Sequence, residues 1–524
     1  MRLTKVLLVL YALDSTGTQA VLTKTGSTCV LTPLSTDNAR AARKRDFEAE
    51  VTAPRKRIGT TVLQERDLNP EEVWVDDPYS ETKKGLWKPG TLGRYPRPEP
   101  SPGSSPPFES PLLERRSESR GAVPVILDSE VDNDDLGDFP SVELEIRQTK
   151  VLDDTPQLLE AFKQCGKDGI VILSPGNYSI RQVMNTTSLS NCSIEMHSAT
   201  LVWSVDNISY WRSRCFSVTY AGRCTAWLLG GRDVSLRGFG TTLFDGNGQT
   251  WIDLAKGQAN LDGRPISLTV WRGTNIFIDG ITWRMAQFWH TFVAYSQNVT
   301  MTNLDMSTWT NSQYKSVNTD GTNTWNSKDV RIANWTVKCG DDCISVKGNS
   351  TNIHVSNVTC YESGAMVVGS IGSNSRQPDY VENVVFENVN LNHSSNAAWI
   401  KTYPGTGYVR NITFRNIRFS DVNQPIYVTS CIYSYQNCDS SRIPITNVRW
   451  ENITGTSRYN VAVGIHCSGG APCDGFHFEN IDIKPKAGGN AKVLCSNIKN
   501  QASSGLQCTG PCPGSHPQQL SGNV

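Results

Sequence analysis

The sequence predicts an all-β protein that folds as a right-handed, single-stranded parallel β-helix with a short N-terminal capping helix. Three observations support this prediction: a strand motif that recurs along the chain, the coil-like length that separates its copies, and a helical pattern ahead of the repeats. Stacked-strand repeat folds use roughly 20 to 30 residues for each coil, and a terminal repeat needs a cap over its open core.

The repeated motif is Asn or Asp, apolar, any residue, apolar, any residue, Asn or Gly, apolar. This alternation places one face of a strand in the core, and Asn or Gly at a corner tolerates left-handed backbone. A β-sandwich is the alternative, but Asn-Gly hairpin turns should then join its strands. The motif instead recurs at coil length with the same phase, in copies that begin at Asp233, Asn275, Asn298, Asp329, Asn352, Asn383, Asn411 and Asn447.

The β-helix domain is predicted to span residues 141–500. Its first element is a helix, because Thr155 can cap it, Pro156 suits the first helical position and apolar residues follow at helical spacing. A short amphipathic helix there would close the first coil. A tail rich in Cys, Pro and Gly follows at residues 501–524.

The N-terminal part of the chain differs from this repetitive domain. Residues 1–20 have a cationic start, an apolar core and a small-residue end, which predict a secretory signal peptide too short to span a bilayer; a buried strand is the alternative. Residues 21–140 hold a basic cluster at 42–45 that could be a processing site, a Pro-rich run and an acidic tract. They predict a low-complexity, disordered segment or a pro-region without a catalytic role.

The cysteines agree with a secreted, extracellular protein. The chain has 15 Cys and more than ten Asn-x-Ser/Thr sequons, and closely spaced Cys in a secreted protein indicate disulfides. Zinc is the alternative, but His partners at ligand spacing are absent. The odd count leaves at least one thiol unpaired, for which Cys29 is our candidate. The short-range pairs suggested by spacing are Cys431 with Cys438, Cys467 with Cys473, and Cys508 with Cys512.

Charge excludes some classes of partner. The chain has 50 Lys and Arg against 50 Asp and Glu, and no basic patch stands out. A nucleic-acid partner is therefore not expected. No apolar run after the N-terminus is long enough for a membrane span, and a monomer is the default expectation.

Three aspartates form the candidate site. Asp341 and Asp342 follow Asp320 by about one coil length, so the coil offset should bring all three together. Adjacent strand residues point to opposite faces, so the pair can share one surface only if the backbone bends, which Gly340 permits. One of several close carboxylates holds its proton, as glycoside hydrolysis requires. A solvated turn or a calcium site is the alternative reading.

The sequence also resembles a known family. Residues 318–320 (Asn-Thr-Asp), 340–343 (Gly-Asp-Asp-Cys), 369–372 (Gly-Ser-Ile-Gly) and 400–401 (Ile-Lys) resemble, in order and spacing, the signature of the polygalacturonase family of pectin-degrading glycoside hydrolases, family 28. The resemblance covers roughly residues 150–500 and is nearest to the exo-polygalacturonase, or galacturan 1,4-alpha-galacturonidase, branch. It implies a pectin-lyase-like right-handed β-helix, no cofactor, no metal, and hydrolysis with inversion.

The resemblance also implies roles for residues. Asp341 is similar to the general acid, and Asp320 with Asp342 to the pair that activates water; inversion would require roughly 6.5 to 9.5 Å between acid and base. Cys343 and Cys360 resemble the disulfide beside the site.

Two positions depart from the family pattern. Gly364 stands where the family has His, and Trp399 where it has Arg, which puts ordinary endo-cleavage of plain polygalacturonate in doubt. Lys401 remains as a cation for a uronate carboxylate. Near it, Tyr403 is a candidate sugar contact, as is Tyr433, and Trp399 and Asn318 are added as candidate substrate-binding residues.

An upstream segment offers further contacts for a substrate. Trp289 could stack on a sugar face, while Gln287 and His290 could bind hydroxyl groups. Packing within a loop is the alternative for all three.

Together these features predict a secreted inverting hydrolase of pectin that cleaves α-1,4-galacturonosyl linkages, exo-acting from a chain end. The inserts at 403–408 and 431–438 could wall off one end of the site. The alternatives are a rhamnogalacturonan hydrolase of the same family, a calcium-dependent pectate lyase with an arginine base, and a non-catalytic carbohydrate-binding β-helix.

Overall fold

The computed structural model describes residues 8–9, 20–33, 152–374, 376–433 and 438–512. The chain divides into two compact units, residues 1–96 with 152–524, and residues 97–151. All described residues belong to the first unit. Most of the predicted signal peptide, and the part of the predicted low-complexity segment from residue 34 onward, lie outside the described residues.

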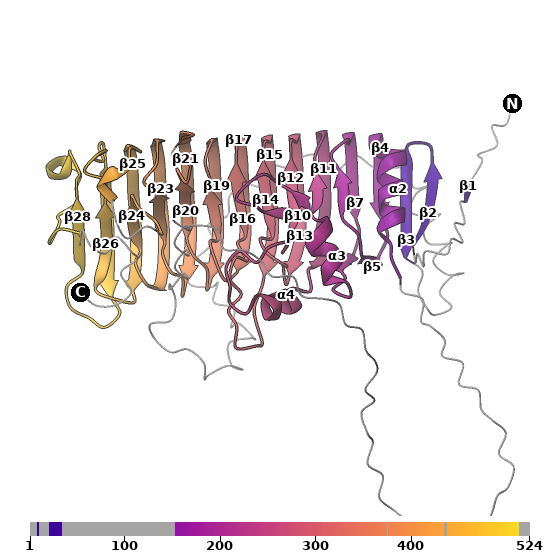
Figure 1. The fold of residues 1–524 in the computed structure, drawn as a ribbon, viewed down its shortest axis with the longest axis horizontal. Helices are drawn as coiled ribbons and strands as arrows, with labels where there is room; N and C mark the ends of the chain where they lie inside the picture. Colours follow the sequence, from indigo (N-terminus) through magenta and orange to yellow (C-terminus); the bar gives the residue numbers. More distant parts are fainter. Residues whose placement is uncertain (1–7, 10–19, 34–151, 375, 434–437, 513–524) are drawn as a thin grey trace, which may run out of the picture. The chain divides into compact units, whose positions relative to one another are not determined.

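The described residues form a right-handed parallel β-helix, as predicted (Figure 1). From β11 onward, each coil contributes one strand to each of two long sheets, and these strands pair in parallel with the next coil. The first sheet has 16 described strands: β1 (Leu8–Val9), β2 (Ala20–Thr25), β3 (Thr28–Pro33), β4 (Lys167–Leu173), β5 (Gly176–Ile180), β7 (Ser190–Met196), β8 (Ala199–Trp203), β11 (Arg232–Asp245), β13 (Thr274–Arg284), β15 (Gln297–Ser307), β17 (Lys328–Lys338), β19 (Ser350–Tyr361), β21 (Asp379–Asn392), β23 (Gly407–Val422), β25 (Ile445–Ser457) and β27 (His477–Pro485).

The second sheet is built mostly from shorter strands, and the candidate site lies along it. Its neighbours are parallel except for β9, which pairs antiparallel with β10. Its 12 described strands are β6 (Met184–Thr186), β9 (Phe216–Ser217), β10 (Cys224–Leu229), β12 (Ile266–Trp271), β14 (Thr291–Ala294), β16 (Thr322–Trp325), β18 (Ile344–Val346), β20 (Met366–Ile371), β22 (Ala398–Thr402), β24 (Ile426–Thr429), β26 (Val461–His466) and β28 (Lys492–Ser496).

The apolar positions of the repeated motif stack on one another inside the coils. The register pairs Val299 with Val330 and Val330 with Ile353, and all three side chains are buried. The same phase in every coil gives a continuous apolar core, and its burial drives the stacking because each coil alone cannot cover its own face.

The Asn positions of the motif form the corners. Two rows of side chains run along the first sheet, and most of the Asn residues donate from Nδ2 to the side chain of the preceding coil. The Asn residues in both rows have φ between 53° and 61°, the left-handed region that Asn tolerates. The first ladder contains Asp233, Asn275, Asn298, Asp329, Asn352, Asn383, Asn411 and Asn447, and the second contains Asp279, Asn303, Asn334, Asn357, Asn388, Asn416, Asn452 and Asn480.

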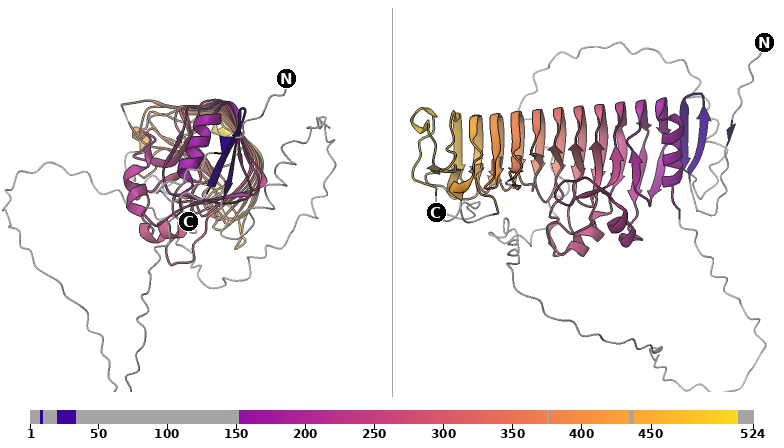
Figure 2. Two further views of the ribbon diagram at one scale, coloured as in Figure 1. Left: turned by 90° about the vertical axis from the view of Figure 1, so that its right-hand side faces the viewer. Right: turned by 45° about the horizontal axis from the view of Figure 1, so that its top comes forward.

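The N-terminal end of the coils is covered by α2 (Thr155–Cys165), which confirms the predicted capping helix (Figure 2). Its buried face includes Leu158, Ala161 and Phe162. The predicted cap residue is wrong, because Asp154 holds the N-cap position and Thr155 is already helical. The Thr155 hydroxyl instead accepts a hydrogen bond from the backbone N–H of Arg181, which ties the helix to the end of β5.

Residues 20–33 correct the predicted boundary of the low-complexity segment. They form the hairpin of β2 and β3, and β3 pairs in parallel with β4. Cys29, predicted to be unpaired, forms a disulfide with Cys165 at the end of α2. The hairpin is short and apolar, so it adds to the sheet by burying residues such as Leu22 and Leu31.

The other disulfides agree with spacing in two of three cases. Cys431–Cys438, Cys467–Cys473 and the family-implied Cys343–Cys360 are present, as is Cys215–Cys224. The predicted pair of Cys508 and Cys512 is wrong, because the tail folds back along β28 and Cys508 bonds Cys495 instead. Free cysteines among the described residues are Cys192, Cys339 and Cys512, all buried.

Two short helices stand outside the stacked coils, on one side of the described unit (Figures 1 and 2). They are α3 (Ile208–Arg214) and α4 (Gly248–Ala255); the 3₁₀ turns η1 (Cys438–Ser440) and η2 (Gln501–Ser503) lie nearer the C-terminal end. Among the helices that the structure describes, none combines the length and apolar character of a membrane span.

Candidate active site

The three aspartates meet where β16 and β18 begin. Thr322 of β16 pairs with Ile344 of β18, and the same offset sets Asp320 beside Asp342. One oxygen from each of Asp320, Asp341 and Asp342 lies within 4.8 Å of the other two. The one-coil offset therefore brings the three carboxylates together, as the spacing predicted; we call them the carboxylate cluster.

The chain bends between β17 and β18, so that adjacent Asp341 and Asp342 both reach the cluster. Gly340 sits at this bend, where a β-carbon would lie 2.0 Å from the backbone oxygen of Ser316. The close approach of the Ser316 backbone therefore requires glycine here. The bend is fixed further by a hydrogen bond from the Gly340 N–H to the Thr319 hydroxyl, 2.8 Å long.

Asp341 is the most exposed member of the carboxylate cluster. It is half-buried, whereas Asp320 and Asp342 are 3% and 2% exposed. Its Oδ2 accepts from the backbone N–H and the Nδ2 of Asn318, at 3.3 and 3.1 Å, and its Oδ1 accepts from the backbone N–H of Asp342 at 2.9 Å. These contacts fix the orientation of a carboxyl group that an incoming molecule can reach.

Asp320 and Asp342 have contrasting surroundings. Asp320 accepts from Asn323 Nδ2 through Oδ2 at 3.1 Å, and its buried Oδ1 has no hydrogen-bond partner among the described residues. Both oxygens of Asp342 accept from Lys401 Nζ, at 3.1 and 2.9 Å. Asp342 is therefore held in an ion pair, whereas Asp320 keeps one oxygen for a further donor.

Two buried lysines supply positive charge to the carboxylate cluster. Lys401 is 2% exposed, and Lys347 lies with its Nζ 3.0 Å from the Gly369 carbonyl oxygen and 3.9 Å from Asp342 Oδ2. Burial lowers the pKa of Lys347. Burial opposes the charge of Lys401 too, but Asp342 and Asp341 outweigh it and raise the pKa of Lys401.

Burial and mutual repulsion favour a proton on the carboxylate cluster. Burial, followed by the charges of Asp341 and Asp342, raises the pKa of Asp320 well above its ordinary value. Burial and the charge of Asp342 also raise the pKa of Asp341. The site can therefore hold a proton at a pH where an isolated carboxyl group has lost it, and an acid and a base can stand side by side.

The segment before β14 does not offer the substrate contacts that we predicted. His290 is fully buried; its Nδ1 lies 3.0 Å from the Asp320 carbonyl oxygen and its Nε2 lies 3.1 Å from the Thr308 hydroxyl. Burial lowers the pKa of His290 to about 4, so the ring is neutral near pH 7. His290 thus positions the backbone of Asp320 instead of binding a sugar hydroxyl.

Its neighbours are packed in the same way. Gln287 is buried and its Oε1 accepts from the Ser267 hydroxyl at 2.5 Å. Trp289 is buried between Phe288 and Phe292, with ring centroids 5.2 and 5.4 Å away. The loop-packing alternative therefore holds for this segment, because neighbouring coils cover side chains that the sequence alone leaves open.

The candidates on and after β22 divide into buried and half-buried groups. Trp399 is buried, stacks on Tyr427 and lies 4.2 Å below Lys401 Nζ, so it supports the lysine. Lys401, predicted to bind a uronate carboxylate, is paired with Asp342 in this structure. Tyr403 is half-buried and its ring lies 5.7 Å from that of Tyr433. These two tyrosines remain candidates for contact with a sugar.

Asn318 also has a structural role. Its side-chain oxygen accepts from the backbone N–H of Asn260, while its Nδ2 donates to Asp341. Both ends of the amide are therefore used within the protein, and Asn318 positions Asp341.

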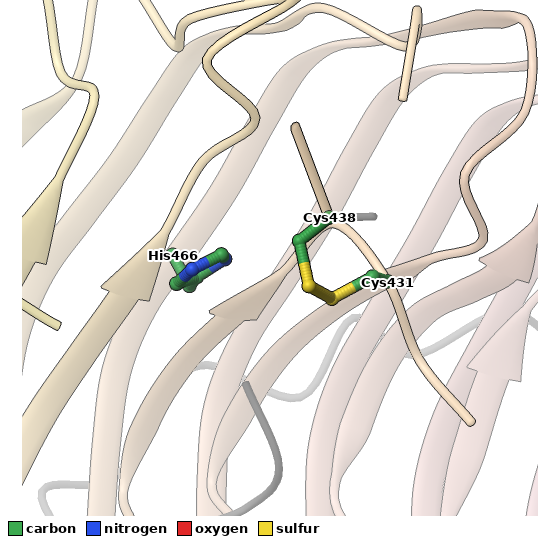
Figure 3. A group of neighbouring side chains, drawn as sticks. All are labelled: Cys431, Cys438 and His466. Carbon is green, nitrogen blue, oxygen red and sulfur yellow. A yellow bond between two sulfur atoms is a disulfide. The ribbon is translucent and has the colours of Figure 1, made fainter. Parts of the chain in front are cut away.

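Three sets of side chains among the described residues have the spacing of a metal site. The carboxylate cluster is one, but Lys347 and Lys401 already supply its counter-charge. A second contains His466 with Cys431 and Cys438, whose sulfur atoms form a disulfide and so cannot act as thiolate ligands (Figure 3). The third, Glu451 with His477 and Glu479, is partly exposed.

Comparison with known proteins decides the family. The model of glycosyl hydrolases family 28 matches residues 217–504, more than half of the chain. The chain belongs to glycosyl hydrolase family 28. It is thus a glycoside hydrolase, and the carboxylate cluster lies within the matched region.

Individual relatives of this family 28 hydrolase differ in the linkage their names specify. A protein of Aspergillus flavus assigned as a galacturan 1,4-alpha-galacturonidase A is 35% identical over 403 residues, covering 68% of this chain and 90% of the relative. An alpha-L-rhamnosidase of Aspergillus niger is 32% identical over 386 residues, covering 70% and 89%. The crystal structure of an endo-xylogalacturonan hydrolase from Aspergillus tubingensis matches with a TM-score of 0.63 and 27% identity, covering 69% and 96%.

The hydrolase departs from the family pattern for a structural reason at Gly364. A β-carbon at this position would lie 2.7 Å from Asp342 Oδ1 and 2.8 Å from Asp342 Cα. A histidine cannot fit here unless the Asp342 backbone shifts. The close packing of the coils around Asp342 therefore leaves no room for the histidine that the family has at position 364.

Sequence reasoning missed three cations of this hydrolase. Lys347 could have been found, because it directly follows β18 and is two residues after Ser345, so strand alternation gives the two side chains the same direction; both donate to the Gly369 carbonyl oxygen. Arg264 is 2% exposed and donates to the carbonyl oxygens of Gln287 and Val317, which anchors the loop before Asp320. Arg223 precedes β10 and faces the same region. No motif marked either arginine.

Proposed function

We propose that this family 28 hydrolase is a secreted enzyme that removes galacturonate from the end of α-1,4-linked galacturonan in pectin, with inversion. The relative assigned as a galacturan 1,4-alpha-galacturonidase supports the substrate. The six disulfides among the described residues support secretion. The observation that carries the chemistry is the carboxylate cluster, in which three acids have three different surroundings.

The surroundings assign a role to each acid. Asp341 is the general acid, because it is the accessible member and its pKa is raised by burial and by Asp342. Asp320 and Asp342 together activate water: the Asp320 Oδ1 has no partner among the described residues and is open to a water molecule, and Asp342 is held in place by its ion pair with Lys401.

The distance between the carboxylates does not itself predict inversion. Inverting enzymes have roughly 6.5 to 9.5 Å between the acid and the base, whereas the nearest oxygens of the carboxylate cluster lie within 4.8 Å of one another. Adjacent coils stack closely, and this spacing sets the distance between Asp320 and Asp341. Inversion therefore depends on the family resemblance, and the product configuration must be measured.

Exo action has support from two inserts that follow β22 and β24. Tyr403 and Tyr433 belong to different inserts and their rings pack 5.7 Å apart. Their contact joins the inserts beside Lys401, where they could close one end of a substrate site. A chain end would then enter, and single residues would leave.

Rhamnogalacturonan is the second candidate substrate. The relative named as an alpha-L-rhamnosidase matches almost as well as the galacturonidase. Trp399 also replaces the family arginine, which weakens recognition of a uronate next to it. The same acids would then act on a rhamnosyl linkage.

The test is to incubate the purified protein with polygalacturonate and with rhamnogalacturonan, and to identify the first product. Galacturonate alone at early times, with inverted anomeric configuration by proton NMR, supports the proposal. Mixed long oligomers contradict exo action, and rhamnose release supports the second candidate. Loss of activity with a calcium chelator together with unsaturated, ultraviolet-absorbing product would show a lyase instead.

A further inference from the structure

A short hairpin next to the carboxylate cluster presents a half-buried arginine. β9 pairs antiparallel with β10, and the disulfide Cys215–Cys224 closes the hairpin at its base. The Val218 N–H donates to the Arg223 carbonyl oxygen at 3.0 Å, and the Arg223 N–H donates to the Tyr220 carbonyl oxygen at 2.8 Å. The backbone that carries Arg223 is therefore fixed by a disulfide and by hydrogen bonds on both of its sides.

The guanidinium group of Arg223 packs on an aromatic ring and has no ionic partner. Its Cζ lies 5.4 Å from the centroid of Phe288. Among the described residues, no hydrogen bond or ion pair uses its side-chain nitrogens. Arg264 packs on the same Phe288 ring at 5.3 Å, but it is buried and its Nε and Nη1 donate to backbone carbonyl oxygens; its buried Nη2 has no partner among the described residues. One ring thus supports a buried arginine that holds the backbone and a half-buried arginine that does not.

Packing contacts connect Arg223 to the carboxylate cluster. Phe288, whose ring lies under the guanidinium group, is two residues before His290, and the His290 backbone N–H donates to the Asp320 carbonyl oxygen at 2.9 Å. Burial lowers the pKa of Arg223, and the charges of Tyr220, Asp262, Asp320 and Tyr403 oppose that effect. Arg223 comes from the coils below Asp320, whereas Tyr403 comes from the coils above it.

The other cations of this site are buried and already hold groups of the protein. Lys401 pairs with Asp342, Lys347 donates to the Gly369 carbonyl oxygen, and Arg264 donates to those of Gln287 and Val317. The position of the family arginine is occupied by buried Trp399. A guanidinium group presents donors in a planar fork that matches both oxygens of a carboxylate.

We propose that Arg223 binds the carboxylate of the galacturonate residue at the scissile linkage and so sets the preference of the enzyme for an acidic sugar. This inference rests on the proposed function, because it names the contact that recognises its substrate. Arg223 replaces, from a different coil, the cation that position 399 does not provide.

The test compares Arg223→Gln and Arg223→Lys on trigalacturonate and on its methyl ester, which lacks the negative charge. We expect Arg223→Gln to lower kcat/KM for the acid roughly 10- to 100-fold and to leave the ester nearly unchanged, with Arg223→Lys in between. Arg272→Gln is the matched control, since Arg272 also lies over aromatic rings, at 5.6 Å from Trp271, but is exposed. An equal fall on both substrates, or an unchanged ratio of acid to ester, would overturn the inference.

Binding to an inactive variant separates this inference from the proposed function. Calorimetry with digalacturonate and its methyl ester is done on Asp341→Asn with and without Arg223→Gln. If the wild-type enzyme cleaves no galacturonan, the proposed function fails, but a roughly 10- to 100-fold loss of digalacturonate affinity in the double variant still supports the role of Arg223. Absent binding in both variants, or equal binding in both, overturns it.

Discussion

The two Asn ladders and the carboxylate cluster use polar side chains in the same solenoid in opposite ways. Each ladder is repetitive and consists mostly of Asn side chains that are hydrogen-bonded from one coil to the next, with Asp at three positions. The carboxylate cluster is charged and occurs at one place, and each Asp has a different partner or none. The ladder hydrogen bonds stabilise many coils equally. In the carboxylate cluster, by contrast, repulsion between buried carboxylates is confined to the place where chemistry is proposed.

Replacing the proposed acid should show the largest difference between the two regions. We expect Asp341→Asn to lower kcat on galacturonan roughly 10²- to 10⁴-fold, because the amide cannot give a proton to the leaving oxygen. The fold should be unaffected, since the amide can keep the contacts with Asn318. Reducing-sugar release measures the effect, with circular dichroism as the control. Residual activity above one-tenth of wild type would remove Asp341 from the acid role.

The ion pair of the carboxylate cluster should matter for both stability and activity. We expect Lys401→Met to lower the free energy of unfolding by about 3 kcal/mol, because Asp342 is then buried with only the more distant Lys347 nearby. Denaturant unfolding at neutral pH measures this change. The surface pair Lys163 with Glu160 gives a matched control, and Lys163→Met should change stability by less than about 1 kcal/mol. Equal losses of unfolding free energy in the two variants would mean that the buried ion pair contributes no more to stability than the surface pair.

The pH dependence of activity sharpens the comparison, because carboxyl pKa values are raised in the carboxylate cluster. Burial first, and then the neighbouring carboxylates, raise the pKa of Asp320 and of Asp341. As pH falls, the carboxylate cluster takes up a further proton, no base is left and activity is lost. As pH rises, the cluster loses the proton that the acid must give, and activity is lost again. We expect a bell-shaped profile of kcat/KM with both limbs above the ordinary carboxyl range; a single limb near pH 4 would contradict it.

A change in a ladder should have the smallest effect. We expect Asn334→Ala to lower the free energy of unfolding by about 2 kcal/mol, because alanine loses two ladder hydrogen bonds and is strained at φ 61°. Asn334→Gly keeps the backbone conformation and should lose only about 1 kcal/mol. Activity of both variants at 25 °C should match that of wild type. A clear fall in kcat would show that the ladders and the carboxylate cluster are coupled.

The sequence predicts the repetitive part of this molecule far better than the site. One motif in eight copies specifies the coils, the Asn corners and the offset that joins Asp320 to Asp342. Contacts around the site come from different coils, so no local pattern shows that His290 and Trp289 are covered. The same holds for Lys401, because the sequence does not distinguish a solvent-exposed lysine from a buried lysine that pairs with Asp342.

The N-terminal hairpin was missed for a related reason. Cys29 and Cys165 are separated by 136 positions, and the intervening charged and Pro-rich composition suggested that the whole stretch stays apart from the fold. Pairing of β3 with β4 depends on a contact made across that stretch. Composition averages over a window and does not reveal a short strand at its edge.

The bond between Cys29 and Cys165 has a consequence for maturation of the enzyme. A protease that cuts at the basic cluster of residues 42–45 would create two polypeptides, yet the smaller one would stay attached through this sulfur bridge. The product would be a covalent heterodimer made from one gene. It would migrate as a single species on a gel until a reducing agent released the N-terminal fragment.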